Sequence, residues 1–288
     1  MKDLTDMEYL TRLFSRHGFH FSKGLGQNFI VDPSICPRIA ESADVDGQGV
    51  LEIGPGAGVL TRALSERAGK VVALEVDKRL APVLAETLDG CGNVSVRFED
   101  AMTCDLHQLI REEFGDAPVS VCANLPYYIT TPLLMRLLEA ELPLRAMTLM
   151  VQKEAAVRLC APMGTRDCGP VTAAVRYYAE PAILFDVGRN AFLPVPAVDS
   201  AVIRLCLREP LLPKEEKAAF FRVVKAAFAL RRKTLLNSLS ASLPMQKNSV
   251  LAVLDRCGIA PTARAETLTM DQLILLAREM PKEDRHAL

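Results

Sequence analysis

The sequence predicts a doubly wound α/β domain followed by a small helical region, and three features predict it. A short apolar strand at residues 50–53 runs into a glycine-rich turn and then into a helical pattern over residues 59–68, which is how doubly wound folds begin. Strand and helix patterns then alternate along the chain. From Lys214 onward only helical periodicity remains. We therefore expect a first, α/β domain over residues 1–208 and a helical domain over residues 209–288.

Composition sets limits on the kind of protein. Half of the 288 residues are hydrophobic, and the formal net charge is −1, so any nucleic-acid partner must be met by a local basic patch. The eight cysteines show no CxxC spacing, and the His17/His20 pair has no companions for a zinc site. We expect no metal and a reduced, cytoplasmic protein. There is no secretory signal, and the uncharged run 117–135 contains three prolines, so we expect no membrane span.

The N-terminal part of the chain is predicted to form a helix followed by a loop. Apolar residues in residues 6–16 have helical spacing. Residues 21–30 are polar, contain two glycines and form either a loop that wraps a ligand or a plain connection. We expect Asp32 to cap the next helix, with Pro33 in its first position.

The glycine turn is followed by acids at the ends of consecutive strands. Its spacing is GxGxG rather than the GxGxxG of dinucleotide sites, which argues against a nicotinamide oxidoreductase. A strand at 71–74 ends at Glu75, whose carboxylate can accept hydrogen bonds from both ribose hydroxyls. A strand at 94–98 ends before Asp100, which can accept from an adenine amino group. Either acid alone can be a helix cap or a solvated turn residue, but their succession favours a nucleoside pocket.

The strand at 119–123 is apolar on both faces and ends at Asn124, where open α/β sheets bind their ligands. The Asn124 amide oxygen can accept from the exocyclic amine of a flat base. Pro126 biases Leu125 toward an extended conformation, which aims the Leu125 carbonyl at the same amine. Tyr127 offers a face for stacking. The alternative is an Asn-Pro turn with Tyr127 as packing.

A stiff loop follows the middle of the chain. Phe192 precedes two spaced prolines and either covers the second face of the base or forms a hydrophobic plug. The other elements expected here are helices at 77–88, 132–140, 153–160 and 171–178, and strands at 146–151, 182–187 and, as the last strand, 200–205.

The C-terminal region is predicted to contain helices at 214–230, 233–239, 249–257 and 270–280. Between Lys217 and Leu254 there are seven basic residues and no acid, which favours a phosphate-binding surface over an ordinary solvated face. The candidate RNA-binding residues are Arg222, Lys225, Arg231, Arg232 and Lys233.

Several ordered motifs together resemble one known family. They are Leu25-Gly-Gln-Asn-Phe-Ile30, Leu51-Glu-Ile-Gly-Pro-Gly-Ala-Gly58, Glu75-Val-Asp77, Glu99-Asp100-Ala101, Asn124-Leu-Pro-Tyr127, Phe192-Leu-Pro-Val-Pro-Ala-Val-Asp-Ser200 and Arg231-Arg-Lys-Thr-Leu235. The chain resembles the ribosomal RNA adenine N6-dimethyltransferases. The Asn124-Leu-Pro-Tyr-Tyr128 form and the Arg-Arg-Lys-Thr-Leu run are similar to the bacterial small-subunit branch, not to the macrolide-resistance branch.

The resemblance implies a fold, a cofactor and site residues. The fold is the Rossmann-like class I methyltransferase fold, a seven-stranded, mostly parallel sheet with an antiparallel hairpin at one edge, plus a small helical domain. The methyl donor is S-adenosyl-L-methionine, which becomes S-adenosyl-L-homocysteine. The implied cofactor-binding residues are Asn28, Ile30, Gly54, Gly56, Glu75, Asp100, Ala101 and Asn124. The implied catalytic residues are Asn124, Leu125, Pro126, Tyr127 and Phe192.

The substrate implied is a pair of adjacent adenosines in the 3′-terminal hairpin loop of small-subunit rRNA, within an assembling 30S particle. We expect a cytoplasmic monomer. The alternatives are a large-subunit methyltransferase of the resistance type and a non-catalytic rRNA-binding assembly factor.

Overall fold

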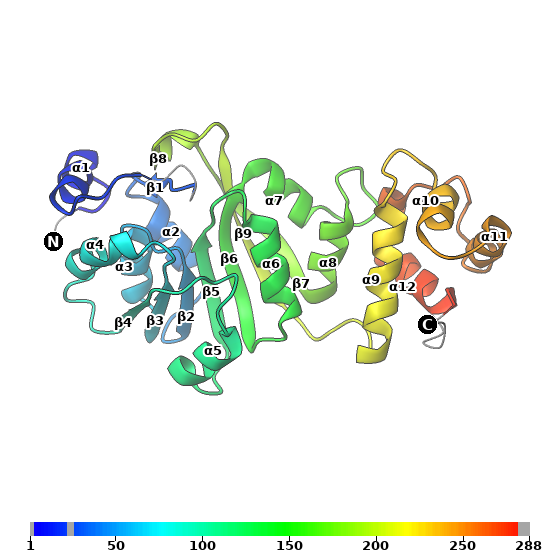
Figure 1. Cartoon of the computed structure of the whole chain (residues 1–288), viewed down its shortest axis with the longest axis horizontal. Coiled ribbons are helices and arrows are strands. Elements are labelled where there is room, and N and C mark those ends of the chain that lie inside the picture. The colour runs from blue at the N-terminus through cyan, green and yellow to red at the C-terminus, as the bar shows by residue number, and fades with distance from the viewer. Residues whose placement is uncertain (1–2, 22–25, 282–288) are drawn as a thin grey trace. The chain divides into compact units, whose positions relative to one another are not determined.

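The computed structural model describes residues 3–21 and 26–281 and divides the chain into two compact units (Figure 1). The first comprises Met1–Ala156 and Glu180–Arg208, and the second comprises Val157–Ala179 and Glu209–Leu288. The end of the first unit at Arg208 coincides with the boundary expected from the sequence. The segment Val157–Ala179, which the sequence placed in the catalytic domain, groups instead with the C-terminal helices.

The first unit is built on a seven-stranded sheet with the order β4-β3-β2-β5-β6-β9-β7. Its strands are β2 (Gly49–Ile53), β3 (Lys70–Leu74), β4 (Val94–Arg97), β5 (Val119–Asn124), β6 (Leu144–Gln152), β7 (Ala179–Val187) and β9 (Ser200–Leu207). Strands β4, β3, β2, β5 and β6 pair in parallel, whereas β9 is antiparallel to β6. The last strand of the sequence thus lies inside the sheet, and β7 forms the edge. The result is the mostly parallel class I methyltransferase sheet that the resemblance implies.

The remaining elements begin within this unit, and one of them, α7, crosses into the second unit after Ala156. They are α1 (Met7–Arg16), β1 (Phe29–Ile30), α2 (Ile35–Ser42), α3 (Val59–Ser65), the 3₁₀ turn η2 (Lys78–Leu80), α4 (Ala81–Thr87), α5 (Leu106–Phe114), α6 (Thr130–Glu139), α7 (Lys153–Cys160), the 3₁₀ turn η3 (Arg189–Ala191) and β8 (Phe192–Leu193). The short strands β1 and β8 form a separate antiparallel pair.

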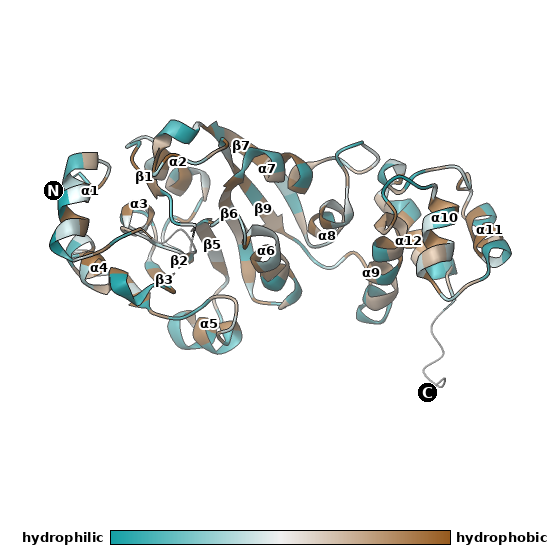
Figure 2. Cartoon of the chain, turned by 45° about the horizontal axis from the view of Figure 1, so that its top comes forward, coloured by the Kyte–Doolittle hydropathy of each residue, from teal (hydrophilic) through white to brown (hydrophobic). Residues whose placement is uncertain are grey.

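Both faces of the sheet are covered, as the apolar strands predict. Helices α2 and α3 pack against one face, together with Val50 and Cys122. Alternate residues point to opposite faces, and their neighbours Leu51 and Val121 are also fully buried. Figure 2 shows the apolar colouring of the strands between more polar helix surfaces.

The strand register brings the site residues to one edge. In the parallel pairs, Ile53 lies opposite both Leu74 and Ala123. Gly54 follows Ile53, Glu75 follows Leu74, and Asn124 follows Ala123. Three residues far apart in sequence therefore meet at the carboxyl edge.

Several helices differ from expectation, most of them by two or three residues at one end. Helix α2 begins at Ile35 rather than at Pro33, because the Asp32 carboxylate accepts hydrogen bonds from the amide and hydroxyl of Ser34 and holds a turn there. The helix after Asp77 opens as a 3₁₀ turn before α4. Helix α5, capped by Asp105, was not predicted. No helix within the described ranges is both long and apolar enough to cross a membrane.

The second unit is helical, with α8 (Pro170–Tyr178), α9 (Lys214–Phe228), α10 (Leu235–Ser242), α11 (Lys247–Arg256), η4 (Ala265–Thr267) and α12 (Met270–Glu279). Aromatic rings join α8 to α9. The rings of Tyr177 and Phe220 stack with centroids 5.0 Å apart, and those of Tyr178 and Phe221 stack at 5.7 Å. These ring contacts with α9 explain why α8 belongs to the second unit, although the two helices are distant in the sequence.

Candidate active site

A cavity opens at the carboxyl edge of the sheet in the first unit. Its empty volume is about 1080 Å³, with open solvent at the mouth included. The structure brings together at this cavity the predicted residues Asn28, Ile30, Gly54, Gly56, Glu75, Asp100, Ala101, Asn124, Leu125, Pro126 and Tyr127. Their sequence separation is large, so the cavity is a product of the fold.

The glycine turn gives the cavity a bare backbone wall. Gly54 and Gly56 have φ values of +74° and +58°, in the left-handed region that residues with a Cβ rarely adopt. A Cβ at Gly54 would meet no atom within 4 Å, whereas a Cβ at Gly56 would lie 3.3 Å from the Phe29 ring. A ligand can therefore approach the main chain closely at Gly54, whereas the main chain at Gly56 lies near the Phe29 ring.

Glu75 is a buried acid at the end of β3. It is 5% exposed, and its two oxygens accept hydrogen bonds from the amides of Asp77 at 2.9 Å and Gly56 at 3.3 Å. Burial raises the pKa of Glu75, and these backbone donors oppose the rise. The backbone thus fixes the carboxylate in place while its remaining lone pairs can accept from a ligand.

Asp77 ties the N-terminal segment to the cavity. Its carboxylate accepts hydrogen bonds from Arg79, and the Gln27 side-chain amide donates to it at 2.9 Å. The Arg79 hydrogen bonds are the main reason that the pKa of Asp77 is lowered. Gln27, next to Asn28, is thereby held against the turn after β3.

Glu52 is a site residue that the sequence analysis missed. It lines the cavity from within β2 and is 1% exposed. Neither of its carboxylate oxygens has a hydrogen-bond partner in the described part of the chain. Burial raises the pKa of Glu52 to about 8, and the charge of Glu75 adds to the rise. The Thr61 hydroxyl partly opposes this rise in the pKa of Glu52, although it makes no hydrogen bond in the described part of the chain. The available signal was an acid inside an otherwise apolar strand.

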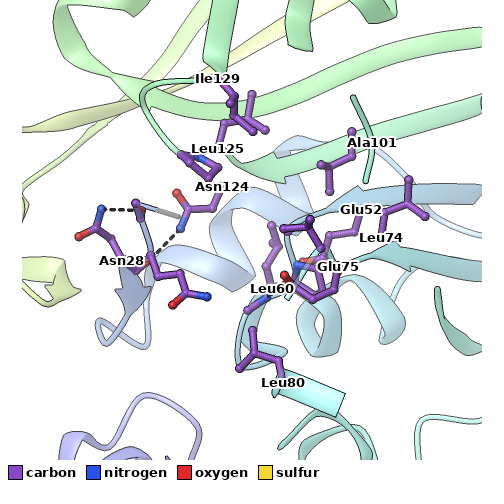
Figure 3. A pocket seen from close by; sticks show the side chains of 18 of the residues that line it. Asn28, Glu52, Leu60, Leu74, Glu75, Leu80, Ala101, Asn124, Leu125 and Ile129 are labelled. Carbon is purple, nitrogen blue, oxygen red and sulfur yellow. Dashed lines mark hydrogen bonds between the residues drawn. The ribbon is translucent and has the colours of Figure 1, made fainter. Parts of the chain in front are cut away.

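Asn124 and Asn28 face each other on one side of the cavity, with Glu52 and Glu75 on the other (Figure 3). The Asn124 side-chain nitrogen donates to the Asn28 main-chain oxygen at 3.2 Å. The Asn28 side chain in turn donates to the Gly26 carbonyl at 3.2 Å. This bond orients the Asn124 amide, and within the described ranges no group donates to its side-chain oxygen, which can accept from a ligand.

The main chain after Asn124 offers a second acceptor. The Leu125 amide donates to the Met150 carbonyl at 3.2 Å. The Pro126 carbonyl accepts from the Ile129 amide and the Thr130 hydroxyl. By contrast, no group in the described ranges donates to the Leu125 carbonyl. Two oxygens of adjacent residues that line the cavity therefore lack a donor in the described part of the chain.

Three further predicted residues are placed as follows. The Tyr127 hydroxyl shares a hydrogen bond of 2.9 Å with the Ser200 hydroxyl, so its half-buried ring is tethered to β9. Asp100 is exposed, and one of its oxygens accepts from the Met102 amide at 2.8 Å. Ala101 is buried and contributes apolar surface.

Phe192 does not lie where a stacking residue would. It is 2% exposed, packs in the hydrophobic core with α2 and α3, and is absent from the described lining of the cavity. Its strand, β8, pairs with β1, and this pairing turns the ring inward. Phe192 is therefore buried in this structure, and its base-stacking role stays a prediction.

The predicted RNA-binding residues belong to the second unit. Lys225, Arg231, Arg232 and Lys233 are exposed. Arg222 is half-buried, and its guanidinium donates to the Pro281 carbonyl at 2.7 Å. Arg222 therefore contributes to packing in this unit, and the four exposed bases are better candidates for phosphate contacts.

Comparison with curated proteins identifies close relatives. Two of them are named ribosomal RNA small subunit methyltransferase A. The protein of Geobacillus thermodenitrificans is 46% identical over 285 residues, covering 97% of this chain and 97% of its own length. The protein of Bacillus cereus is 43% identical over 286 residues, covering 97% and 98%.

Solved structures agree. The 23S rRNA methyltransferase ErmE matches with a TM-score of 0.69 and 31% identity, over 87% of this chain and 98% of its own. A dimethyladenosine transferase from Plasmodium falciparum matches with a TM-score of 0.71 and 26% identity, over 86% and 95%. A family model described as "Ribosomal RNA adenine dimethylase" matches residues 18–282. With the motifs in order along the chain and gathered at one cavity, this chain belongs to the ribosomal RNA adenine dimethylase family.

Proposed function

We propose that the chain transfers methyl groups from S-adenosyl-L-methionine to N6 of two adjacent adenosines in the 3′-terminal hairpin loop of small-subunit rRNA. The observation that carries the proposal is the pair of available oxygens, on the Asn124 side chain and the Leu125 main chain, of two residues that line the same cavity as Glu52 and Glu75. The proposal includes an assembling 30S particle as the substrate and a cytoplasmic monomer as the enzyme.

The cavity fits an adenosine-bearing methyl donor. Glu75, held by two backbone amides, can accept from ribose hydroxyls. The apolar side chains of Leu74, Leu80 and Ala101 line the neighbouring wall, where a purine ring can pack. Gly54 leaves room for close approach of the ligand to the backbone. Bound there, S-adenosyl-L-methionine supplies a methyl group on a positively charged sulfonium.

The polar groups of the chain suit an amine that is a weak nucleophile. The lone pair of adenine N6 is delocalised into the ring, and the Asn124 and Leu125 oxygens can accept its two hydrogens. This favours a tetrahedral nitrogen with its lone pair directed into the cavity. Positioning of this kind can lower a barrier by about 7–11 kcal/mol in favourable cases. A proton leaves N6 to water, so no strong base of the chain is needed.

A base must leave its stack to reach this pocket. Tyr127 can stack on it, and such a contact is worth about 1–3 kcal/mol per base. The Ser200 hydrogen bond holds the ring still, which reduces the entropy that binding must remove. After the first transfer one N6 hydrogen remains, and either oxygen can accept it.

The proposal is tested by tritiated methyl transfer from S-adenosyl-L-methionine to undermethylated small subunits, followed by nucleoside analysis. We expect label in N6,N6-dimethyladenosine. Naked large-subunit rRNA is assayed in parallel, because ErmE, which is 31% identical, is a 23S rRNA methyltransferase. Label on the large-subunit RNA alone would favour that alternative, and RNA binding without label would favour an assembly factor.

The exposed bases of the second unit give a separate prediction. Changing Arg231→Glu together with Arg232→Glu should weaken binding to small-subunit rRNA and flatten its salt dependence, by about 1 in the log–log slope for each lost phosphate contact. Filter binding at several salt concentrations measures both quantities.

The matched control is Arg111→Glu with Lys78→Glu, two exposed bases of the first unit with the same change in net charge. The control should retain most of the affinity. If both double variants lose affinity equally, net charge and not this surface is responsible. If neither loses affinity, the bases form an ordinary solvated face.

A further inference from the structure

Two consecutive tyrosines follow Pro126, and the structure treats them differently. Tyr127 is half-buried and tethered through its hydroxyl to Ser200. Tyr128 is 58% exposed, although it also lines the mouth of the cavity. A tyrosine buries a large apolar ring when it can, so this exposure requires an explanation.

Gly26 is a neighbour of the Tyr128 ring. A Cβ built on Gly26 would lie 3.4 Å from the ring atoms Cδ1 and Cε1 and 3.5 Å from Pro126 Cβ. Gly26 has φ +59°, so a larger residue is disfavoured there. Gly26 therefore neighbours one edge of the Tyr128 ring, while more than half of the side chain faces solvent.

The backbone that carries Tyr128 is also fixed. Pro126 restricts its own φ, and its carbonyl accepts from the Ile129 amide at 3.2 Å and the Thr130 hydroxyl at 3.2 Å. Helix α6 begins at Thr130. The main chain on both sides of Tyr128 is therefore fixed by these contacts. No hydrogen bond to the Tyr128 hydroxyl exists within the described ranges.

An exposed aromatic ring that projects from a fixed main chain beside a pocket is suited to stacking with an unpaired base. If the target adenosine occupies the pocket at Asn124, the next nucleotide is also drawn out of regular stacking and lies at the pocket mouth. We propose that the nucleotide adjacent to the target adenosine stacks on the Tyr128 ring. The second adenosine is thereby kept beside the pocket while the first is methylated, and the two then exchange places. This inference rests on the proposed function.

Kinetics on undermethylated small subunits test this stacking. Tyr128→Leu keeps an apolar side chain but removes the flat face, and should raise KM for the particle by about 5- to 100-fold. The value of kcat should stay within about twofold, and the affinity for S-adenosyl-L-methionine should not change. Tyr128→Phe should restore KM, because the ring and not the hydroxyl is required. Ile183→Ala, which truncates a side chain 44% exposed on β7, is the control.

The distribution of products provides a second readout. With a small excess of particles, the wild type should accumulate few particles in which only one adenosine is dimethylated. Tyr128→Leu should accumulate more of them, because the second adenosine is released between transfers. An unchanged KM and product distribution in Tyr128→Leu, or a loss of cofactor affinity, would overturn the stacking role. Failure of the proposed function is distinct, since the wild type itself would then transfer no methyl group to the particle.

Discussion

Asn124→Ala should lower kcat for methyl transfer by about 10²–10³-fold or more, the loss seen when one preorganised polar group at a reacting centre is removed. The alanine eliminates the side-chain oxygen that accepts from N6 and leaves only the Leu125 carbonyl. It also eliminates the donor to the Asn28 carbonyl, so the affinity for S-adenosyl-L-methionine should fall modestly, by about tenfold or less. Single-turnover transfer and equilibrium cofactor binding separate the two effects.

The control for this change is Asn248→Ala, the same substitution at an exposed position at the start of α11. It should leave both quantities near the wild-type values. Thermal unfolding of both variants establishes that they are folded. Near-wild-type turnover of Asn124→Ala would show that the amide oxygen does not orient the amine, and the mechanism would have to be abandoned.

The free energy of unfolding of the wild type should fall as pH rises, and the Glu52→Gln variant should not show this fall. Burial raises the pKa of the Glu52 carboxyl to about 8 from its ordinary value of 4.5. A carboxyl with a raised pKa binds more protons in the folded chain than in the unfolded chain. The free energy of unfolding therefore falls as pH rises through the interval between these two values, and the loss is complete above about pH 8.

The size of this effect is on the order of 4 kcal/mol for a fully buried group with this change in pKa. Urea unfolding of the wild type and of Glu52→Gln at pH 5, 7 and 9 measures it. The wild type should lose stability relative to the variant across this range. Glu139→Gln, an exposed acid on α6, should follow the wild type. Parallel curves for the wild type and Glu52→Gln would mean that Glu52 is ionised in the folded protein at neutral pH.

Much of the catalytic unit could be predicted from local patterns. The strands at Gly49–Ile53, Lys70–Leu74 and Val119–Asn124 are apolar runs bounded by turn residues, so their periodicity is visible without any contact. Helix α5 was missed because its apolar positions, Leu106, Leu109 and Ile110, form a narrow stripe among charged residues. Its cap at Asp105 was the one local signal available.

The roles of individual side chains were harder to predict. Phe192 has the same sequence context whether it is exposed beside a base or buried, and the pairing of β8 with β1 decides for burial. Arg222 belongs to a run of bases, yet it donates to the Pro281 carbonyl fifty-nine residues away. In both cases the partner is distant in sequence, so periodicity carries no information about it.

The sequence alone determined most of the strands and helices in their chain order, the glycine turn, and the acids and amide that end successive strands. These features follow from local conformational preferences, and parallel pairing necessarily places such strand ends at one edge. Only the tertiary structure decided which polar groups are buried without partners, as at Glu52, which acceptors stay available, as at Leu125, and which ring is exposed, as at Tyr128. Burial and hydrogen bonding depend on segments brought together by folding, and that information is not contained in any one stretch of the chain.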